Sequence, residues 1–159
     1  MAVLRQVLGR LGLRLNEEKT RRVNAWREYF DFLGFTFTLR KSRRSGKYYP
    51  HVEPSKASIQ RIKSRVTQLT GRRLASIPLP DVLSNLNRSL RGWSGYFHYR
   101  NSTTAFNRVK WHVEERVRIH LRRRHKLKSR AAGYARFPSS KLYTLGLFKL
   151  PTTAGWKIA

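Results

Sequence analysis

The chain has 159 residues, 40% of them hydrophobic, which is enough for one domain or two small ones with a buried core. Its 35 Lys and Arg residues against 8 Asp and Glu residues give a formal net charge of +27, and a compact state with so many like charges needs counterions or phosphates to screen it. We therefore expect a nucleic-acid partner, with a membrane surface as the weaker alternative. The absence of cysteine excludes disulfides, and without a spanning apolar run or a signal peptide we expect a cytoplasmic or organellar protein that is not secreted.

The N-terminal third alternates between helical and extended patterns. Residues 2–11 place apolar side chains on one face, which predicts a short amphipathic helix ending near Gly12. Residues 13–16 alternate like the start of a strand, and a polar turn follows. We expect exposed apolar surface on the helix, at Val3, Val7, Leu8 and Leu11, and on the strand from Phe30 to Phe37.

A second extended region spans residues 30–52. The alternation of apolar residues from Leu33 to Leu39 predicts one strand that begins near Phe30. A basic loop over residues 40–47 follows, and Tyr48–Val52 is then the returning strand of a hairpin.

Three amphipathic helices come next. Ser55 is the predicted N-cap of the first and Gly71 its end, while the second is expected from about Asp81 to Tyr99, after a stiff proline-containing linker. The third follows the turn at 101–104, and its apolar stripe is Phe106, Val109, Val113, Val117 and His120 or Leu121. Short connections predict a small antiparallel bundle. Beyond it we expect an irregular basic stretch over 127–137 and a short helix over 139–143.

The second of these helices carries the most informative stretch, residues 86–97. Its apolar stripe, built from Leu83, Leu86, Leu90, Trp93 and Phe97, predicts a core face, and the arginines are turned away from it. Two glycines inside the helix each cost about 1 kcal/mol relative to alanine. Their presence at positions 92 and 95 predicts that another backbone or a ligand approaches closely there.

The run Leu-Asn-x-x-Leu-Arg-Gly-Trp-x-x-Tyr-Phe at 86–97 resembles the signature of the maturase-specific domain, also called the thumb or X domain, of group II intron reverse transcriptases. The resemblance implies that residues 54–159 form that domain and residues 1–53 a remnant of the polymerase palm. It implies a mainly α fold in which a short helix and a β-hairpin from the edge of the palm precede a three-helix, thumb-like bundle.

Two shorter resemblances lie in the predicted palm remnant. The run from Gly12 to Thr20 is similar to the motif that follows the catalytic centre in this family, and Lys19 matches a lysine that lies near the incoming nucleotide. Phe32, Leu33, Gly34 and Phe35 resemble the primer grip, where glycine lets a sugar-phosphate backbone come close.

The resemblance implies a domain that binds intron RNA for splicing and clamps an RNA–DNA template-primer. The family's catalytic Tyr-Ala-Asp-Asp motif would precede residue 1. Because Asp31 and Asp81 are the only aspartates, we do not expect this chain to polymerise DNA by itself, although an upstream reverse transcriptase fragment would complete an RNA-directed DNA polymerase. We expect no cofactor in the chain, and Mg²⁺ only in a complete polymerase or in the bound RNA. Five histidines without cysteine make a zinc site improbable.

Composition alone leaves a different class open, namely a basic ribosomal-type protein that fills RNA grooves. In either case we predict phosphate contacts by exposed cations and base stacking by aromatic side chains, although packing within the bundle explains each aromatic residue equally well. Adjacent glutamates, at 17–18 and 114–115, are expected to be solvated. The predicted RNA-binding residues are Lys56, Arg61, Lys63, Arg65, Arg72, Arg73, Arg88, Arg91, Tyr96, Tyr99, Arg100, Lys110, Trp111, Arg122, Arg123, Arg124 and Lys126.

Overall fold

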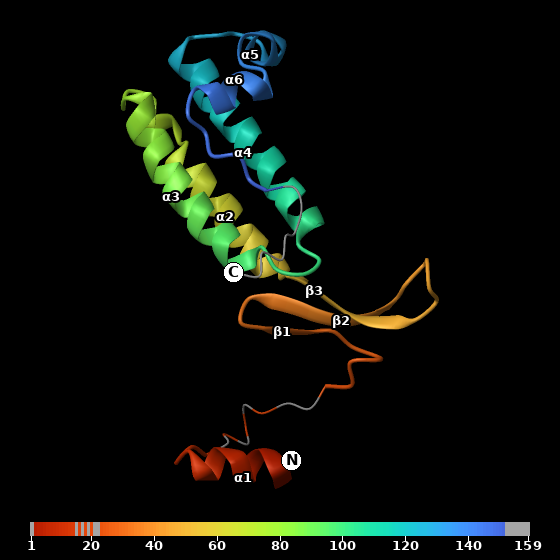
Figure 1. The fold of residues 1–159 in the computed structure, drawn as a ribbon. Coiled ribbons are helices and arrows are strands. Elements are labelled where there is room, and N and C mark those ends of the chain that lie inside the picture. The colour runs from red at the N-terminus through yellow and green to blue at the C-terminus, as the bar shows by residue number, and fades with distance from the viewer. Residues whose placement is uncertain (1, 15, 17, 19, 21–22, 152–159) are drawn as a thin grey trace.

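The computed structural model describes residues 2–14, 16, 18, 20 and 23–151. In chain order its elements are α1 (Ala2–Arg10), β1 (Phe30–Phe32), β2 (Phe35–Lys41), β3 (Tyr48–Pro54), α2 (Lys56–Leu69), a 3-10 turn η1 (Arg72–Leu74), α3 (Leu79–Phe97), α4 (Thr103–Arg124), α5 (Arg130–Arg136) and α6 (Ser139–Thr144). Figure 1 shows α2, α3 and α4 side by side, with the sheet at one end of this bundle and α5 and α6 at the other. The predicted mainly α architecture is confirmed.

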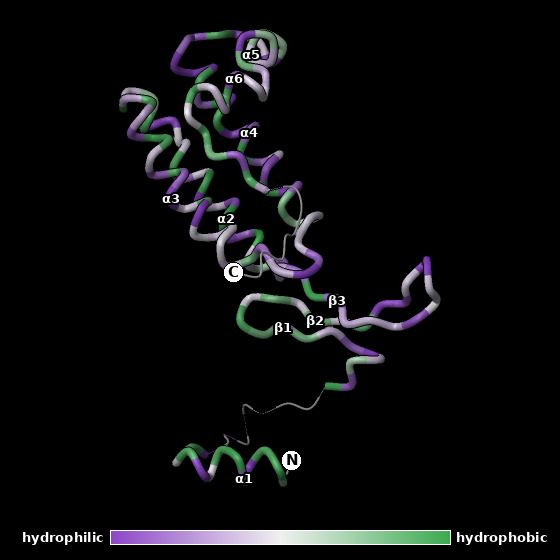
Figure 2. The backbone as a smooth tube through the Cα atoms, viewed as in Figure 1, coloured by the Kyte–Doolittle hydropathy of each residue, from purple (hydrophilic) through white to green (hydrophobic). Residues whose placement is uncertain are grey.

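The helix α1 confirms the predicted amphipathic segment, and Gly12 follows it with φ +69°. Its apolar side chains face solvent, and Val3 is 73% exposed. Figure 2 shows this alternation of hydrophobic and hydrophilic positions along α1, which lies apart from the sheet and the bundle. The predicted start of a strand at 13–16 is wrong for the described residues 13, 14 and 16, which are coil, and Lys19 lies outside the described residues.

The predicted single strand over residues 30–39 is a hairpin instead. Phe32 pairs with Phe35, so Leu33 and Gly34 form a two-residue turn in which both residues have positive φ, +49° and +81°. Positive φ at both central positions is typical of a type I′ turn, whose twist fits antiparallel strands. Alternation could not show this turn because it falls between apolar residues. The predicted returning strand is confirmed as β3, which makes a three-stranded antiparallel sheet of order β1-β2-β3.

The bundle confirms the three predicted apolar stripes. Ser55 caps α2 and accepts a hydrogen bond from the Ser58 amide at 3.2 Å. Helix α3 begins and ends two residues earlier than predicted, with Pro80 in its first turn. Gly71 does not close α2 in a left-handed conformation, because its φ is −63° and it precedes η1. The buried residues of the three helices include Ile62, Val66, Leu83, Leu86, Leu90, Val109, Val113, Val117 and Leu121.

Residues 127–137 are not irregular throughout, because they contain α5, which packs on the outer side of α4. Glu114 and Glu115 were expected to be solvated but are largely buried, and Glu115 contacts Arg130 and Tyr134 of α5. The Arg118 guanidinium lies against Glu115, with Nη1 to Oε2 at 3.0 Å, and its Nε donates to the Phe137 carbonyl at 3.0 Å. Glu114 accepts hydrogen bonds from Ser139 and Tyr143 of α6. The sequence pattern of α4 alone does not show which of its outer faces another helix covers.

Candidate nucleic-acid interface

The outer face of α3 carries a line of two arginines and two glycines. Arg88, Arg91, Gly92 and Gly95 are spaced i, i+3, i+4 and i+7, so they share one side of the helix, opposite its buried stripe. All four are exposed. We call them the α3 stripe. A Cβ added at Gly92 or Gly95 would meet no other atom of the described structure within 4 Å, so the helix backbone is open there.

A groove of about 570 Å³ runs beside the α3 stripe, and Arg88 and Arg91 form part of its lining. Its opposite wall is the chain after α6. Asn87 fastens this wall, because its Nδ2 donates to the Gly146 carbonyl at 2.7 Å and its Oδ1 accepts from the Phe148 amide at 2.8 Å. The Arg91 guanidinium also lies 5.3 Å from the centre of the Phe148 ring, within reach of a cation–π interaction.

Sequence analysis did not identify this role of Asn87. The residue lies inside the recognised run at 86–97, but nothing in helical spacing indicates that a segment about sixty residues later packs beside it. Leu147 and Leu150 of that segment are buried in the same core as the three helices. The groove therefore depends on tertiary structure, whereas the position of the arginines depends on helical spacing alone.

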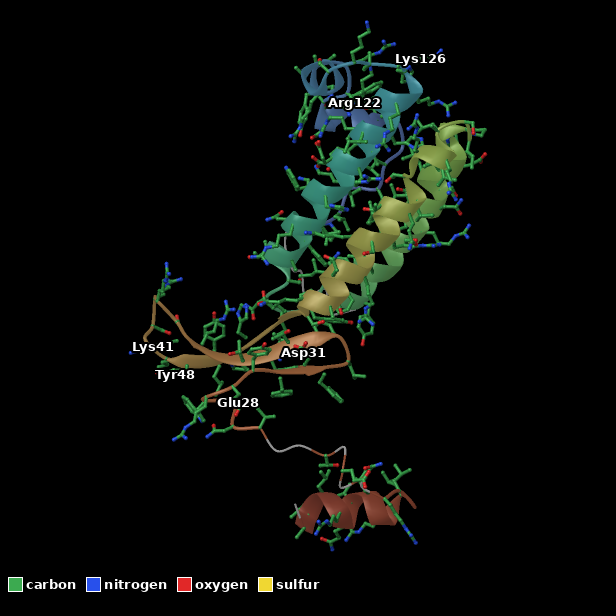
Figure 3. The ribbon with its side chains drawn as sticks, turned by 180° about the vertical axis from the view of Figure 1, so that it is seen from behind. Glu28, Asp31, Lys41, Tyr48, Arg122 and Lys126 are labelled. Atoms are coloured by element: carbon green, nitrogen blue, oxygen red, sulfur yellow. The ribbon has the colours of Figure 1, made fainter. Side chains whose placement is uncertain are left out.

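A second group of predicted cations gathers at the end of the bundle far from the sheet. Figure 3 shows Arg122 and Lys126 at this end, where η1 also brings Arg72 and Arg73. Two members of the group have structural contacts. Arg124 Nη1 donates to the Ala75 carbonyl at 3.3 Å, and the Arg122 stem lies beside Gly133 of α5. Arg72, Arg73, Arg123 and Lys126 are exposed.

A third group lies where α2 meets the first half of α4. Lys63 and Trp111 line one groove of about 400 Å³, together with Arg108, which sequence analysis missed. Trp111 is 62% exposed, as a base-stacking residue should be. Arg108 could have been found from its place three residues before Trp111, on the same side of the helix. Lys110 is not part of this group, because its Nζ lies 4.0 Å from Glu114 Oε1.

Histidine and arginine side chains join α2 to α4 beneath these cations. His112 Nε2 lies 3.2 Å from both the Lys63 carbonyl and Thr67 Oγ1, and burial lowers the pKa of His112. Arg116 Nη2 donates to the Thr67 carbonyl at 3.3 Å, at the negative end of α2. Burial and then the charge of Arg123 lower the pKa of Arg116.

The residues that resemble a primer grip are joined to α2 and α3. Gly34 is crowded, since a Cβ there would lie 2.9 Å from Ser58 Oγ, and its carbonyl accepts a hydrogen bond from that hydroxyl at 2.9 Å. The Tyr96 hydroxyl donates to the Leu33 carbonyl at 3.0 Å, and the Phe35 ring packs against Phe97, with ring centres 4.9 Å apart.

The remaining predicted RNA-contacting residues differ in how far their side chains already contact other parts of the protein. Tyr96 is half-exposed, but its hydroxyl and ring serve the turn at Leu33. The Tyr99 ring lies 4.0 Å from the His98 ring, and Arg100 follows with φ +56°. Arg61 Nη2 donates to Ser58 Oγ at 3.2 Å. Lys56 and Arg65 are exposed on α2, while Leu33 and Phe32 are exposed at the hairpin.

The predicted RNA-binding residues therefore do not form one continuous surface: most lie in three separate groups, and Lys56, Arg61, Arg65, Tyr96, Tyr99, Arg100 and Lys110 lie outside them. Among the described residues there is no cluster of three His, Asp or Glu side chains that could hold a metal ion, and no helix long and apolar enough to cross a membrane.

The comparison with known families identifies one domain. The model of the group II intron, maturase-specific domain matches residues 59–137, from the first turn of α2 to the residue after α5. No curated protein matches the chain. The matched range includes the whole α3 stripe, whereas the sheet, α6 and the far wall of the groove lie outside it.

Proposed function

We propose that this chain has a maturase-type role in group II intron splicing and performs it by binding intron RNA at the α3 stripe. The proposal starts from the match of residues 59–137 to the maturase-specific domain of group II introns. The main observation behind this proposal is that Arg88 and Arg91 share one side of α3 with two glycines, at which an added Cβ would meet no other atom of the described structure within 4 Å. Arginine offers a planar fork of donors that fits phosphate oxygens, and the missing side chains leave room for the RNA backbone.

Charge supplies most of the affinity in this proposal. Each phosphate that the chain neutralises releases condensed counterions and steepens the fall of log K with log salt, by roughly 0.9 for duplex DNA and 0.7 for single strands. Specificity comes from the shape of the folded RNA and from unpaired bases that stack on aromatic rings. The groove beside Arg91 supports this proposal, because its second wall restricts how an RNA strand can lie.

A second part of the proposal concerns the template-primer. We propose that the turn at Leu33–Gly34 and the end of α3 contact an RNA–DNA duplex together, because the Tyr96 hydroxyl joins them directly. The exposed apolar side chains of the N-terminal region, such as Val3, Trp26 and Phe32, support completion of this site by an upstream reverse transcriptase fragment.

The test is a binding titration with a self-splicing group II intron RNA and a size-matched ribosomal RNA fragment over a salt series. We compare the unmodified chain with Arg88→Ala plus Arg91→Ala, and use Arg10→Ala plus Arg14→Ala as a control that removes the same charge outside the bundle. We expect the intron complex to survive higher salt than the ribosomal one and only the α3 variant to lose this preference. Equal affinity for both RNAs, with the same dependence of affinity on salt, would contradict the maturase proposal and favour the ribosomal-type alternative.

A further inference from the structure

The polar face of the sheet borders α2 and α4, whereas Phe35 on the apolar face packs against Phe97 of α3. Asp31 pairs with Thr36, and Thr36 pairs with Glu53, so these three side chains form one row across the strands. The adjacent row of Phe30, Phe37 and Val52 points to the other face because side chains alternate along a strand. Figure 3 labels Asp31 on the sheet, near the end of the bundle where α2 begins.

A cavity of about 260 Å³ lies where this polar row meets the bundle. Asp31, Thr36 and Glu53 line it from the sheet, while Lys56, Ile59 and Arg108 line it from α2 and α4. A sheet that packs on helices ordinarily buries its apolar face, because unpaired polar groups are costly to desolvate. Here Phe35 of the apolar face packs on α3, while the polar row borders a space that polar and apolar groups line together.

The cavity lining carries both signs of charge, and on the sheet side Arg40 pairs with Glu53, so Asp31 is the carboxylate without an arginine partner among the lining residues. The two carboxylates come from the strands, whereas Lys56 is the first residue of α2 and Arg108 lies in the second turn of α4. The positive N-terminal ends of both helices add to the attraction for an anion. Thr36 Oγ1 donates to Asp31 Oδ1 at 2.5 Å, which orients that carboxylate, and Arg40 Nη2 lies 3.5 Å from Glu53 Oε1.

A surface that binds only phosphate gains nothing from carboxylates, which repel it. The chain has 8 acidic residues, and two of them line this one cavity. A carboxylate does suit the edge of a base that presents N–H donors, because it accepts two parallel hydrogen bonds. Guanine offers such a pair on its Watson–Crick edge, whereas uracil presents a single N–H donor between two carbonyl oxygens. Ile59 and Tyr29 provide apolar surface for the base.

We propose that this cavity binds one unpaired guanine nucleotide of the RNA, with its base edge at Asp31 and its phosphate at Lys56 and Arg108. The inference rests on the proposed RNA binding and adds a base-specific contact away from the α3 stripe. An unpaired guanosine that enters the cavity fixes the position of the sheet end of the bundle on the RNA.

The test uses the full chain and the four ribonucleoside monophosphates as probes. Amide chemical shifts of Thr36, Thr38 and Ala105 are followed during titration with each nucleotide to millimolar concentration. We expect GMP to bind more tightly than UMP by about fivefold or more, the discrimination of one bidentate contact. Asp31→Asn should reduce the affinity for GMP to that for UMP, and Lys56→Ala plus Arg108→Ala should weaken the binding of all four nucleotides.

Asp81→Asn is the matched control, because it removes an exposed aspartate at the start of α3. It should leave the order of the nucleotides unchanged. Equal shifts with all four nucleotides, no shifts at the cavity, or an unchanged GMP preference in Asp31→Asn would overturn the inference. The intron titration separates the two proposals, since preserved intron binding together with no nucleotide preference refutes only the cavity site.

Discussion

Replacing Gly92 and Gly95 of the α3 stripe by alanine should stabilise the fold and weaken RNA binding in the same protein. Both glycines lie inside α3, and a Cβ at either position meets nothing within 4 Å in the described structure. Alanine is favoured over glycine in a helix interior by about 1 kcal/mol, so the double variant should gain about 2 kcal/mol in free energy of unfolding. For a chain of 159 residues, each kcal/mol corresponds to roughly 2 to 4 °C in Tm.

The two added methyl groups project along the line on which we place the RNA backbone. We expect affinity for the intron RNA to fall by about fivefold, which corresponds to about 1 kcal/mol. Circular dichroism melts measure the stability change, and filter binding at fixed salt measures the affinity. Gly9→Ala in α1 is the control, because its Cβ position is equally open but lies outside the bundle. A double variant that is more stable and binds RNA as tightly as before would refute the close approach at the α3 stripe.

Three further predictions concern contacts that stabilise the groove and the bundle. Asn87→Ala removes both hydrogen bonds to the far wall of the groove. The Phe148 amide should then exchange faster with solvent hydrogen, and the affinity for RNA should fall while the helices remain folded; slow exchange at Phe148 would contradict this. Arg118→Met leaves the Phe137 carbonyl without its donor and removes one partner of Glu115, which keeps Tyr134 and Arg130, so it should cost about 1 to 3 kcal/mol in urea unfolding. The exposed Arg130→Ala should change the free energy of unfolding little, and equal effects of the two variants would count against the buried network. Burial lowers the pKa of His120 below 6.5, nearby arginines lower it further, and a contact with Thr70 opposes the shift. The folded state therefore binds fewer protons than the unfolded chain, so stability should decline as pH falls below 6.5. An NMR titration midpoint of His120 at or above 6.5 would disprove this.

Local sequence patterns were sufficient for α1, α6 and the three bundle helices, and for the side of each bundle helix that faces the core, but not for α5, which lies in a stretch that was expected to be irregular. The apolar spacing from Leu83 to Phe97 predicts which face of α3 is buried, and therefore that Arg88 and Arg91 are exposed. Ser55 as a cap and Pro80 in a first turn were likewise predictable, because both depend on only a few neighbouring residues.

Tertiary structure decided what those surfaces contact. Glu115 is buried beneath α5 because Arg118 and Tyr134 meet it there, although its sequence neighbours indicate a solvated charge. Asn87 forms one wall of a groove only because the chain returns to it at Phe148. The cavity at Asp31 needs the register of three strands and the N-terminal ends of two helices at once. Periodicity describes neighbours within one element, whereas these sites depend on contacts between elements distant along the chain.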